Sequence, residues 1–194
     1  KIQLAATFRD FRAYNASACS GTVDQNSKVD GCITQAEAQK YGGYFAARHG
    51  HPDFERMNVT ELNGNIALST LGNDGLPVFG SSSGQITASS YQMWYRDFPG
   101  INRTVKGSLE LTCQNKTNGV YVYENGNYFP LTNDPRGYGN HDGQSNDFHF
   151  TTHIQTYFKY DGNPATLHFY GDDDVWVFVN GKKAIDLGGC HSQT

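Results

Sequence analysis

The sequence predicts a mainly β protein, an antiparallel β-sandwich with long loops and one short helix, and two observations support this prediction. The 194 residues include 22 Gly, 12 Phe and 12 Tyr, a composition that favours strands and turns over helices. Short runs of alternating apolar residues are also separated by turn signals about every ten residues, which is typical of sandwiches. The chain shows no internal repeat and no linker, so we expect a single domain over residues 1–194.

The first half of the chain carries one predicted strand and one predicted helix. Residues 1–14 alternate in hydrophobicity as a half-buried strand does. Thr34 and Glu37 have the spacing of a capping box, and Gly42-Gly43 would end the helix that follows. We therefore expect a short helix near residues 35–41.

The second half carries the clearest strand pattern. Residues 105–112 and 120–124 alternate on either side of an Asn-Gly turn, and residues 148–160 keep a period of two over a long strand. A further hairpin is predicted because apolar runs flank Asn180-Gly181, a pair that favours the tight turns of β-hairpins. The strands of this region are expected at residues 167–170, 175–179 and 182–187.

Charge and hydropathy exclude two classes of partner. The net charge is -4 and the Lys and Arg residues do not cluster, so the basic surface that nucleic-acid binding needs is missing. The longest apolar run is Val175 to Val179, far below the roughly 20 residues that span a bilayer. The sequence also contains no phosphate-binding glycine loop before a helix, so we expect a non-enzymatic protein.

The cysteines favour disulfides. Cys19, Cys32, Cys113 and Cys190 form no C-x-x-C pair, which argues against a zinc site and leaves three possible disulfide connectivities. Cys19 and Cys32 bracket a polar loop, and closing such a loop stabilises a fold by about 3 kcal/mol. We expect that pair, and therefore Cys113 with Cys190; the alternative is four reduced thiols in a cytosolic protein.

Four N-x-[ST] sequons offer sites for N-glycosylation. They lie at Asn15, Asn58, Asn102 and Asn115. This count is only a mild excess over chance, but together with the expected disulfides it predicts a secreted or cell-surface glycoprotein.

Two groups of acidic residues are candidate calcium ligands. Asp172, Asp173 and Asp174 lie between predicted strands, where adjacent carboxylates repel one another unless a cation or backbone donors neutralise them. Calcium is the cation that suits oxygen ligands of this kind. Aspartates also favour turns, so a purely structural role is the alternative.

The second group resembles part of an EF-hand loop. Its candidate ligands are Asp24, Asn26, Asp30 and Glu37, and residues 30–37 match the second half of such a loop, with Gly31 at the sixth position. The first half departs from the pattern because Lys28 stands where a carboxylate is usual. The alternative is that Glu37 serves the helix cap alone.

The histidines give a weaker signal. His149 and His153 share one face of the strand predicted over residues 148–160, but the spacing supplies no third ligand. We therefore expect surface histidines, including those of His49-Gly-His51.

The segment Gly171-Asp-Asp-Asp-Val-Trp-Val-Phe178 resembles the fibro-slime family, a branch of the β-sandwich modules named after the anthrax protective antigen. Further matches are Thr7-Phe-Arg-Asp-Phe11, His51-Pro-Asp-Phe-Glu55, Trp94-Tyr-Arg-Asp-Phe-Pro-Gly100 and Tyr128-Phe-Pro-Leu131. The resemblance implies a sandwich of the protective-antigen/fibro-slime type and a role in extracellular matrix or adhesion.

The resemblance also implies how calcium would bind. In the calcium-dependent sugar-binding relatives, adjacent aspartates joined by a cis peptide hold a calcium ion that ligates sugar hydroxyls. That pair maps best onto Asp173 and Asp174, with Asn180 as a further oxygen ligand.

Family members continue past Leu187-Gly-Gly189 with further strands, so we expect a sandwich without its last strands, which would leave backbone donors unpaired. We therefore expect a calcium-stabilised homopolymer that forms extracellular fibres or matrix by exchanging β-strands between subunits. The alternative is a calcium-dependent carbohydrate-binding adhesin or lectin module with a glycan ligand.

Overall fold

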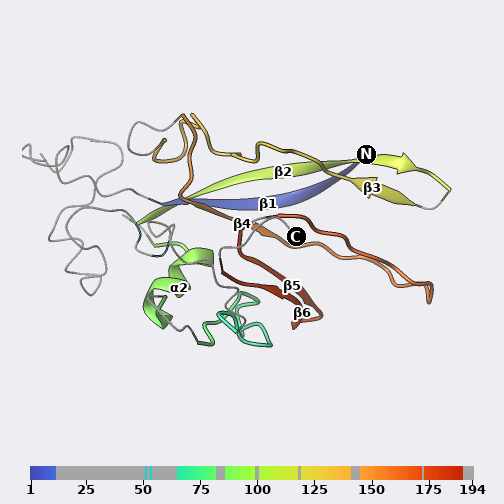
Figure 1. The fold of residues 1–194 in the computed structure, drawn as a ribbon, viewed down its shortest axis with the longest axis horizontal. Helices are drawn as coiled ribbons and strands as arrows, with labels where there is room; N and C mark the ends of the chain where they lie inside the picture. Colours follow the sequence, from blue (N-terminus) through green and yellow to red (C-terminus); the bar gives the residue numbers. More distant parts are fainter. Residues whose placement is uncertain are drawn as a thin grey trace, which may run out of the picture.

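The structure is a computed structural model that describes residues 1–11, 51, 53, 65–81, 86–98, 101–117, 119–140, 145–171 and 173–189. Within these residues the chain forms antiparallel sheets and one short helix (Figure 1), so the predicted mainly β class is confirmed. The helix predicted near residues 35–41 lies outside the described residues.

The main sheet has four strands in the order β3-β2-β1-β4. The bounds are Ile2–Phe11 for β1, Asn102–Asn115 for β2, Val120–Val122 for β3 and Phe150–Ile154 for β4. All the pairs are antiparallel, and β1 lies between β2 and β4 over residues 6–10. The strands predicted at the N-terminus and around the Asn118-Gly119 turn are thereby confirmed.

One face of this sheet carries the first core cluster. Phe8 lies opposite Val105 of β2, and both side chains are buried with Ala6 and Leu131. Tyr128 packs against the same cluster, so the segment that follows β3 covers this half of the sheet. Because side chains alternate across a strand, the other face carries polar residues. They are Thr7, Arg9, Thr104, Lys106, Thr151 and His153.

Helix α2, Ala88–Tyr95, was not predicted from the sequence. Its N-terminus is held by a capping box in which the Thr87 hydroxyl accepts from the Ser90 backbone N–H at 3.1 Å and Ser90 Oγ accepts from the Thr87 N–H at 3.0 Å. The helix buries Tyr91 and Trp94 in a second core cluster with Ile66 and Ala67. A serine at the third position is an unusual capping-box partner, which explains why the sequence pattern missed the helix.

The predicted hairpin around Asn180-Gly181 is confirmed. Strands β5, Val175–Val179, and β6, Lys182–Leu187, pair antiparallel. Asn180 and Gly181 have φ angles of 50° and 76°, the two positive values that a type I′ turn requires. Trp176 of β5 packs on the second core cluster, so the hairpin is attached to α2 through aromatic contacts.

Two predicted strand segments are wrong. The strand predicted over residues 148–160 contains only the five residues of β4, and residues 167–170 form no strand. Residues 155–170, here called the arm, instead run away from the sheet and return to β5 (Figure 1). The alternating pattern favours an extended backbone, but a strand also needs a partner, and the pairing of β4 with β1 ends at Ile154 opposite Ala6.

Candidate functional site

Asp174 links the two ends of the β5–β6 hairpin. It lies just before β5, and its Oδ1 accepts a hydrogen bond from the backbone N–H of Gly189, beyond the end of β6. Its own N–H donates to Oδ1 of Asp173 at 2.9 Å, while the Asp173 side chain is exposed. Both aspartates therefore accept hydrogen bonds from backbone N–H groups. This arrangement fits the purely structural role that was the alternative to calcium binding.

The structure does not bring Asn180 together with these aspartates. Asn180 lies in the turn at the far end of β5, six residues after Asp174, and six residues of strand span about 20 Å. A calcium ion bound by Asp173 and Asp174 would therefore be out of reach of Asn180, because Ca²⁺ ligands lie at about 2.3–2.6 Å. Asp172 is outside the described residues.

The described residues contain no group of three or more His, Cys, Asp or Glu side chains that could hold a metal ion. All peptide bonds in this part of the chain are trans, the bond between Asp173 and Asp174 included. The second predicted calcium loop, with Asp24, Asn26, Asp30 and Glu37, lies outside it.

Replacing Asp174 by alanine tests its structural role. We expect Asp174→Ala to lower the free energy of unfolding by about 1–2 kcal/mol, because the Gly189 N–H loses its acceptor. The loss should be the same in calcium and in a chelator, as measured by urea denaturation. Lys182→Ala, at an exposed position of the same hairpin, is the control and should change stability by less than about 0.5 kcal/mol. A loss confined to calcium-containing buffer would show that the ion, and not the backbone contact, is what Asp174 serves.

Segments that are far apart in the sequence meet where β1 passes α2. Arg9 Nε donates to Asp97 Oδ1 at 2.9 Å, and Trp94 Nε1 donates to Asp53 Oδ2 at 2.8 Å. The rings of Phe11 and His51 contact edge to face at 5.1 Å. Three of the five segments that carried the resemblance, those at residues 7–11, 51–55 and 94–100, are thus joined through side chains of their described residues.

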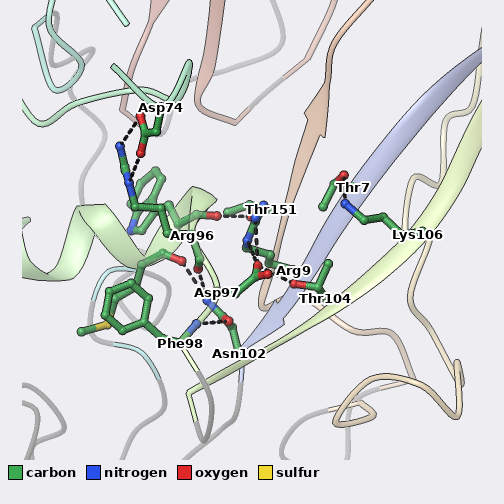
Figure 2. A network of polar contacts seen from close by, with 12 residues as sticks. Thr7, Arg9, Asp74, Arg96, Asp97, Phe98, Asn102, Thr104, Lys106 and Thr151 are labelled. Atoms are coloured by element: carbon green, nitrogen blue, oxygen red, sulfur yellow. Dashed lines mark hydrogen bonds and ion pairs between the residues drawn. The ribbon is translucent and has the colours of Figure 1, made fainter. Parts of the chain in front are cut away.

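Figure 2 shows the ion pair at the centre of this junction. The Arg9 side chain is 8% exposed and the Asp97 side chain 65% exposed. Thr104 Oγ1 also donates to Asp97 Oδ1 at 2.6 Å, and this bond, together with the charge of Arg9, lowers the pKa of Asp97. Burial lowers the pKa of Arg9, and the charge of Asp97 partly restores it. Asp97 therefore neutralises a guanidinium that the fold has largely removed from water.

The junction also encloses two histidines, so the expectation of surface histidines is wrong for His51 and His149. His51 is fully buried and His149 is 9% exposed. Burial, with a smaller contribution from the charge of His149, lowers the pKa of His51 to about 3. Burial raises the pKa of the neighbouring Asp53 to about 6, although hydrogen bonds from Ser90 and Trp94 oppose this. At neutral pH the imidazole of His51 is therefore uncharged.

The predicted disulfide between Cys113 and Cys190 is not formed, because Cys113 has a free, half-buried thiol on β2. Its strand neighbour is Tyr121 of β3, which places it in the middle of a hairpin. Cys19, Cys32 and Cys190 lie outside the described residues, as do the sequons at Asn15 and Asn58.

The two remaining sequons lie in different surroundings. Asn102 is 5% exposed at the start of β2, whereas Asn115 is exposed at the end of the same strand. A glycan needs room outside the fold, so the structure does not support one at Asn102.

The arm is the most exposed apolar part of the described chain. Tyr157 is 89% exposed, Tyr170 71% and Phe158 69%. In the described residues no backbone group of the arm pairs with a strand, and Asp161 and Asn163 make local hydrogen bonds, one of them from Asn163 N to Asp161 Oδ1 at 3.0 Å. Exposed aromatic side chains on an unpaired extended backbone are features that protein–protein contact surfaces share.

Comparisons with known proteins identify relatives in one organism. Protein psiR of Dictyostelium discoideum is 33% identical over 156 residues, which make up 73% of this chain and 16% of psiR. Protein psiQ is 32% identical over 153 residues, 73% of this chain and 15% of psiQ. Protein psiH is 34% identical over 170 residues, 74% of this chain and 23% of psiH. This chain is a distant homologue of the Dictyostelium psi proteins.

The chain thus spans less than a quarter of the length of these three psi proteins. No family model matches the chain, and no solved structure matches it. Among the helices of the described residues, none has the length and hydropathy needed to cross a membrane.

Proposed function

We propose that this chain is a non-enzymatic extracellular domain that self-associates into fibres or matrix, with the arm of one copy accepting a β-strand from another. The observation that carries the proposal is the arm, in which six large apolar side chains are exposed and no strand partner is present in the described residues. Strand addition would supply partners for its backbone donors and acceptors and cover its aromatic rings.

The sheet beside the arm is also open. Residues Ile2–Ala5 of β1 pair with β2, but the ladder with β4 begins only at Ala6. The apolar face continues there beyond the buried core onto Ile2, which is 40% exposed, and onto half-buried Leu4 and Leu109. The start of β1 and the arm extend toward the same end of the molecule (Figure 1). An added strand at this end would therefore cover both surfaces.

The charge of the arm favours a second copy of this chain as the partner. The whole chain carries a net charge of -4, so most contacts between copies are opposed by repulsion. The arm contains one Lys and one Asp, Lys159 and Asp161, and therefore has no net charge at neutral pH. Two copies can approach through the arm without the repulsion that the rest of the surface imposes.

The extracellular part of the proposal rests on sequence features. The motifs at residues 171–178, 7–11 and 94–100 support membership of the fibro-slime family, and the sequons support passage through the secretory pathway. The structure adds that two of these motifs, residues 7–11 and 94–100, meet in one junction. They hold the domain together, while the arm is left for contacts with other chains.

Charged substitutions in the arm test the proposal. We expect the wild-type chain to form oligomers whose size rises with concentration in analytical ultracentrifugation, and the double variant Tyr157→Lys, Tyr170→Lys to sediment as a monomer. The double variant Asn125→Lys, Asn127→Lys is the matched control, because it adds the same charge at exposed loop positions outside the arm. A wild-type chain that stays monomeric at all concentrations, or an arm variant that assembles like wild type, would contradict the proposal.

Calcium-dependent carbohydrate binding is a second candidate, favoured by the exposed carboxylate of Asp173. Burial raises the pKa of Tyr95, and the charges of Asp174 and Asp173 raise it further. Asp173 and Asp174 therefore lie near the ring of Tyr95, and aromatic side chains are common in ligand-binding sites. A glycan array with and without a chelator tests it: we expect binding that the chelator removes and that Asp173→Asn weakens. Binding that persists in the chelator would reject this candidate.

A further inference from the structure

We infer that Asn115 is an acceptor for an N-linked glycan and that Asn102, although it has the same sequence signal, is not. The inference rests on the extracellular location in the proposed function and does not depend on self-association. Both asparagines lie on β2 and both are followed two residues later by threonine. The sequence motif is the same at both positions, but their surroundings in the structure differ.

Asn102 is a structural residue whose side-chain amide is fully used. Its Nδ2 donates to the carbonyl oxygens of Met93 and Arg96, both at 2.9 Å, and its Oδ1 accepts from the N–H of Phe98 at 2.9 Å. These three bonds tie the end of α2 to the start of β2 (Figure 2). A sugar on Nδ2 would remove a donor hydrogen and would have to fit where the residue is 5% exposed, so the glycosylated chain could not adopt this fold.

The threonine of the same sequon is also engaged. Thr104 Oγ1 donates to Asp97 Oδ1, the carboxylate that neutralises Arg9. The sequon at residues 102–104 therefore lies in the junction between β1 and α2.

Asn115 has the opposite surroundings. It is exposed at the last position of β2, and the residues that follow, Lys116 and Thr117, are exposed in a turn. Its Oδ1 accepts from the N–H of Thr117 at 2.9 Å, so the side chain is held in an Asx turn with the threonine of the sequon. The strand register also shifts between Cys113 and Asn115, which separates Asn115 from the regular part of the sheet. The sequon at residues 115–117 thus lies at the surface, in an exposed turn at the end of β2.

The position of this glycan has a consequence for assembly. Asn115 lies beside β3, and the strand order β3-β2-β1-β4 places β3 at one edge of the sheet and β4 at the other. A bulky sugar next to an edge strand blocks the addition of another chain there. A glycan at Asn115 would therefore hinder strand addition at the β3 edge.

The chemical step is a glycosyl transfer from a lipid-linked oligosaccharide pyrophosphate. The Asn115 Nδ2 forms a bond to the anomeric carbon of the sugar, the bond from that carbon to the pyrophosphate oxygen breaks, and Nδ2 loses one proton. The lipid pyrophosphate leaves with the electron pair, so no oxidant or reductant is involved.

Expression through a eukaryotic secretory pathway with an added signal peptide tests the inference. We expect mass spectrometry of the secreted, folded chain to find glycan on the peptide that contains Asn115 and none on the peptide that contains Asn102. Asn115→Gln and Thr117→Ala should each remove that glycan, and Thr117→Ser should restore it. Asn127→Gln, at an exposed asparagine outside any sequon, is the matched control and should leave the Asn115 glycan in place.

An unmodified Asn115 peptide in secreted, folded chain would overturn the inference. So would a glycan on Asn102 in material whose circular dichroism matches that of the unglycosylated chain. Sedimentation of the same samples reports self-association separately. A glycosylated monomer would therefore contradict the proposed assembly but support glycosylation of Asn115. An unglycosylated oligomer would support the assembly but contradict glycosylation of Asn115.

Discussion

Trp94→Ala is expected to lower the free energy of unfolding by about 3–5 kcal/mol, the range for removing a large buried aromatic side chain. Trp94 is 3% exposed, and its ring lies 5.1 Å from Tyr91 and 5.9 Å from Trp176. The substitution also removes the indole N–H that donates to the buried carboxylate of Asp53. Because the ring joins α2 to the β5–β6 hairpin, its loss weakens both attachments at once.

Urea denaturation followed by circular dichroism measures this effect. Gln92→Ala is the matched control, because Gln92 is exposed on the same helix, and we expect a change below about 0.5 kcal/mol. Trp94→Phe keeps most of the ring but not the donor, and should cost about 1–3 kcal/mol because Asp53 loses a hydrogen bond. A loss below about 1 kcal/mol for Trp94→Ala would mean that the second core cluster is not what holds α2 in place.

The second large effect is acid destabilisation through His51. Its pKa is about 3 in the folded chain, whereas an ordinary exposed histidine has a pKa of 6.5. Between these values the unfolded chain binds a proton that the folded chain does not, so folding stability falls as the pH decreases from 6.5 toward 3. The full shift corresponds to about 4–5 kcal/mol.

Asp53 acts in the opposite direction. Its pKa is raised from 3.8 to about 6, so the folded chain binds the extra proton, and this group contributes stability below pH 3.8 that is lost as the pH rises through 6. The wild-type chain therefore shows the difference between the two effects, with that of His51 the larger. Removing His51 leaves the effect of Asp53 together with those of other shifted groups, such as His153, whose pKa burial also lowers.

We expect His51→Gln to flatten or reverse the dependence of stability on pH between 4 and 6.5. Urea denaturation across this range measures it, and the slope is informative even if the variant is less stable at neutral pH. His168→Gln is the control, because His168 is exposed on the arm, and its slope should match that of wild type. If the His51→Gln slope also matched wild type, the buried imidazole could not be the source of the acid sensitivity.

Local patterns were sufficient for the elements whose conformation neighbouring residues determine. The alternation of residues 1–14 predicted β1, and Asn180-Gly181 predicted the β5–β6 hairpin, because the turn needs positive φ angles that these residues tolerate. Helix α2 was missed because its capping partner is Ser90 rather than Glu or Gln. A Thr-x-x-Ser signal followed by aromatic residues at positions 91, 94 and 95 would have found it.

The candidate site depended on contacts that no local pattern contains. Three consecutive aspartates suggested a metal site, but Asp174 accepts a hydrogen bond from the backbone N–H of Gly189. That residue follows β6, the other strand of the hairpin. The two sequons on β2 share one motif, yet only Asn102 is enclosed, because it meets Met93 and Arg96 across a turn. The motif histidine His51 was expected at the surface and lies against Phe11.

The sequence by itself determined the mainly β class, the strand β1 and the Asn-Gly hairpin, because hydrophobic alternation and turn chemistry act between residues that are close along the chain. Only the tertiary structure decided which polar residues are buried, where β4 ends and which aromatic residues stay exposed on the arm. Those outcomes depend on whether a partner strand or a donor from a distant segment is present. An extended stretch such as residues 155–160 becomes a strand only where another backbone pairs with it.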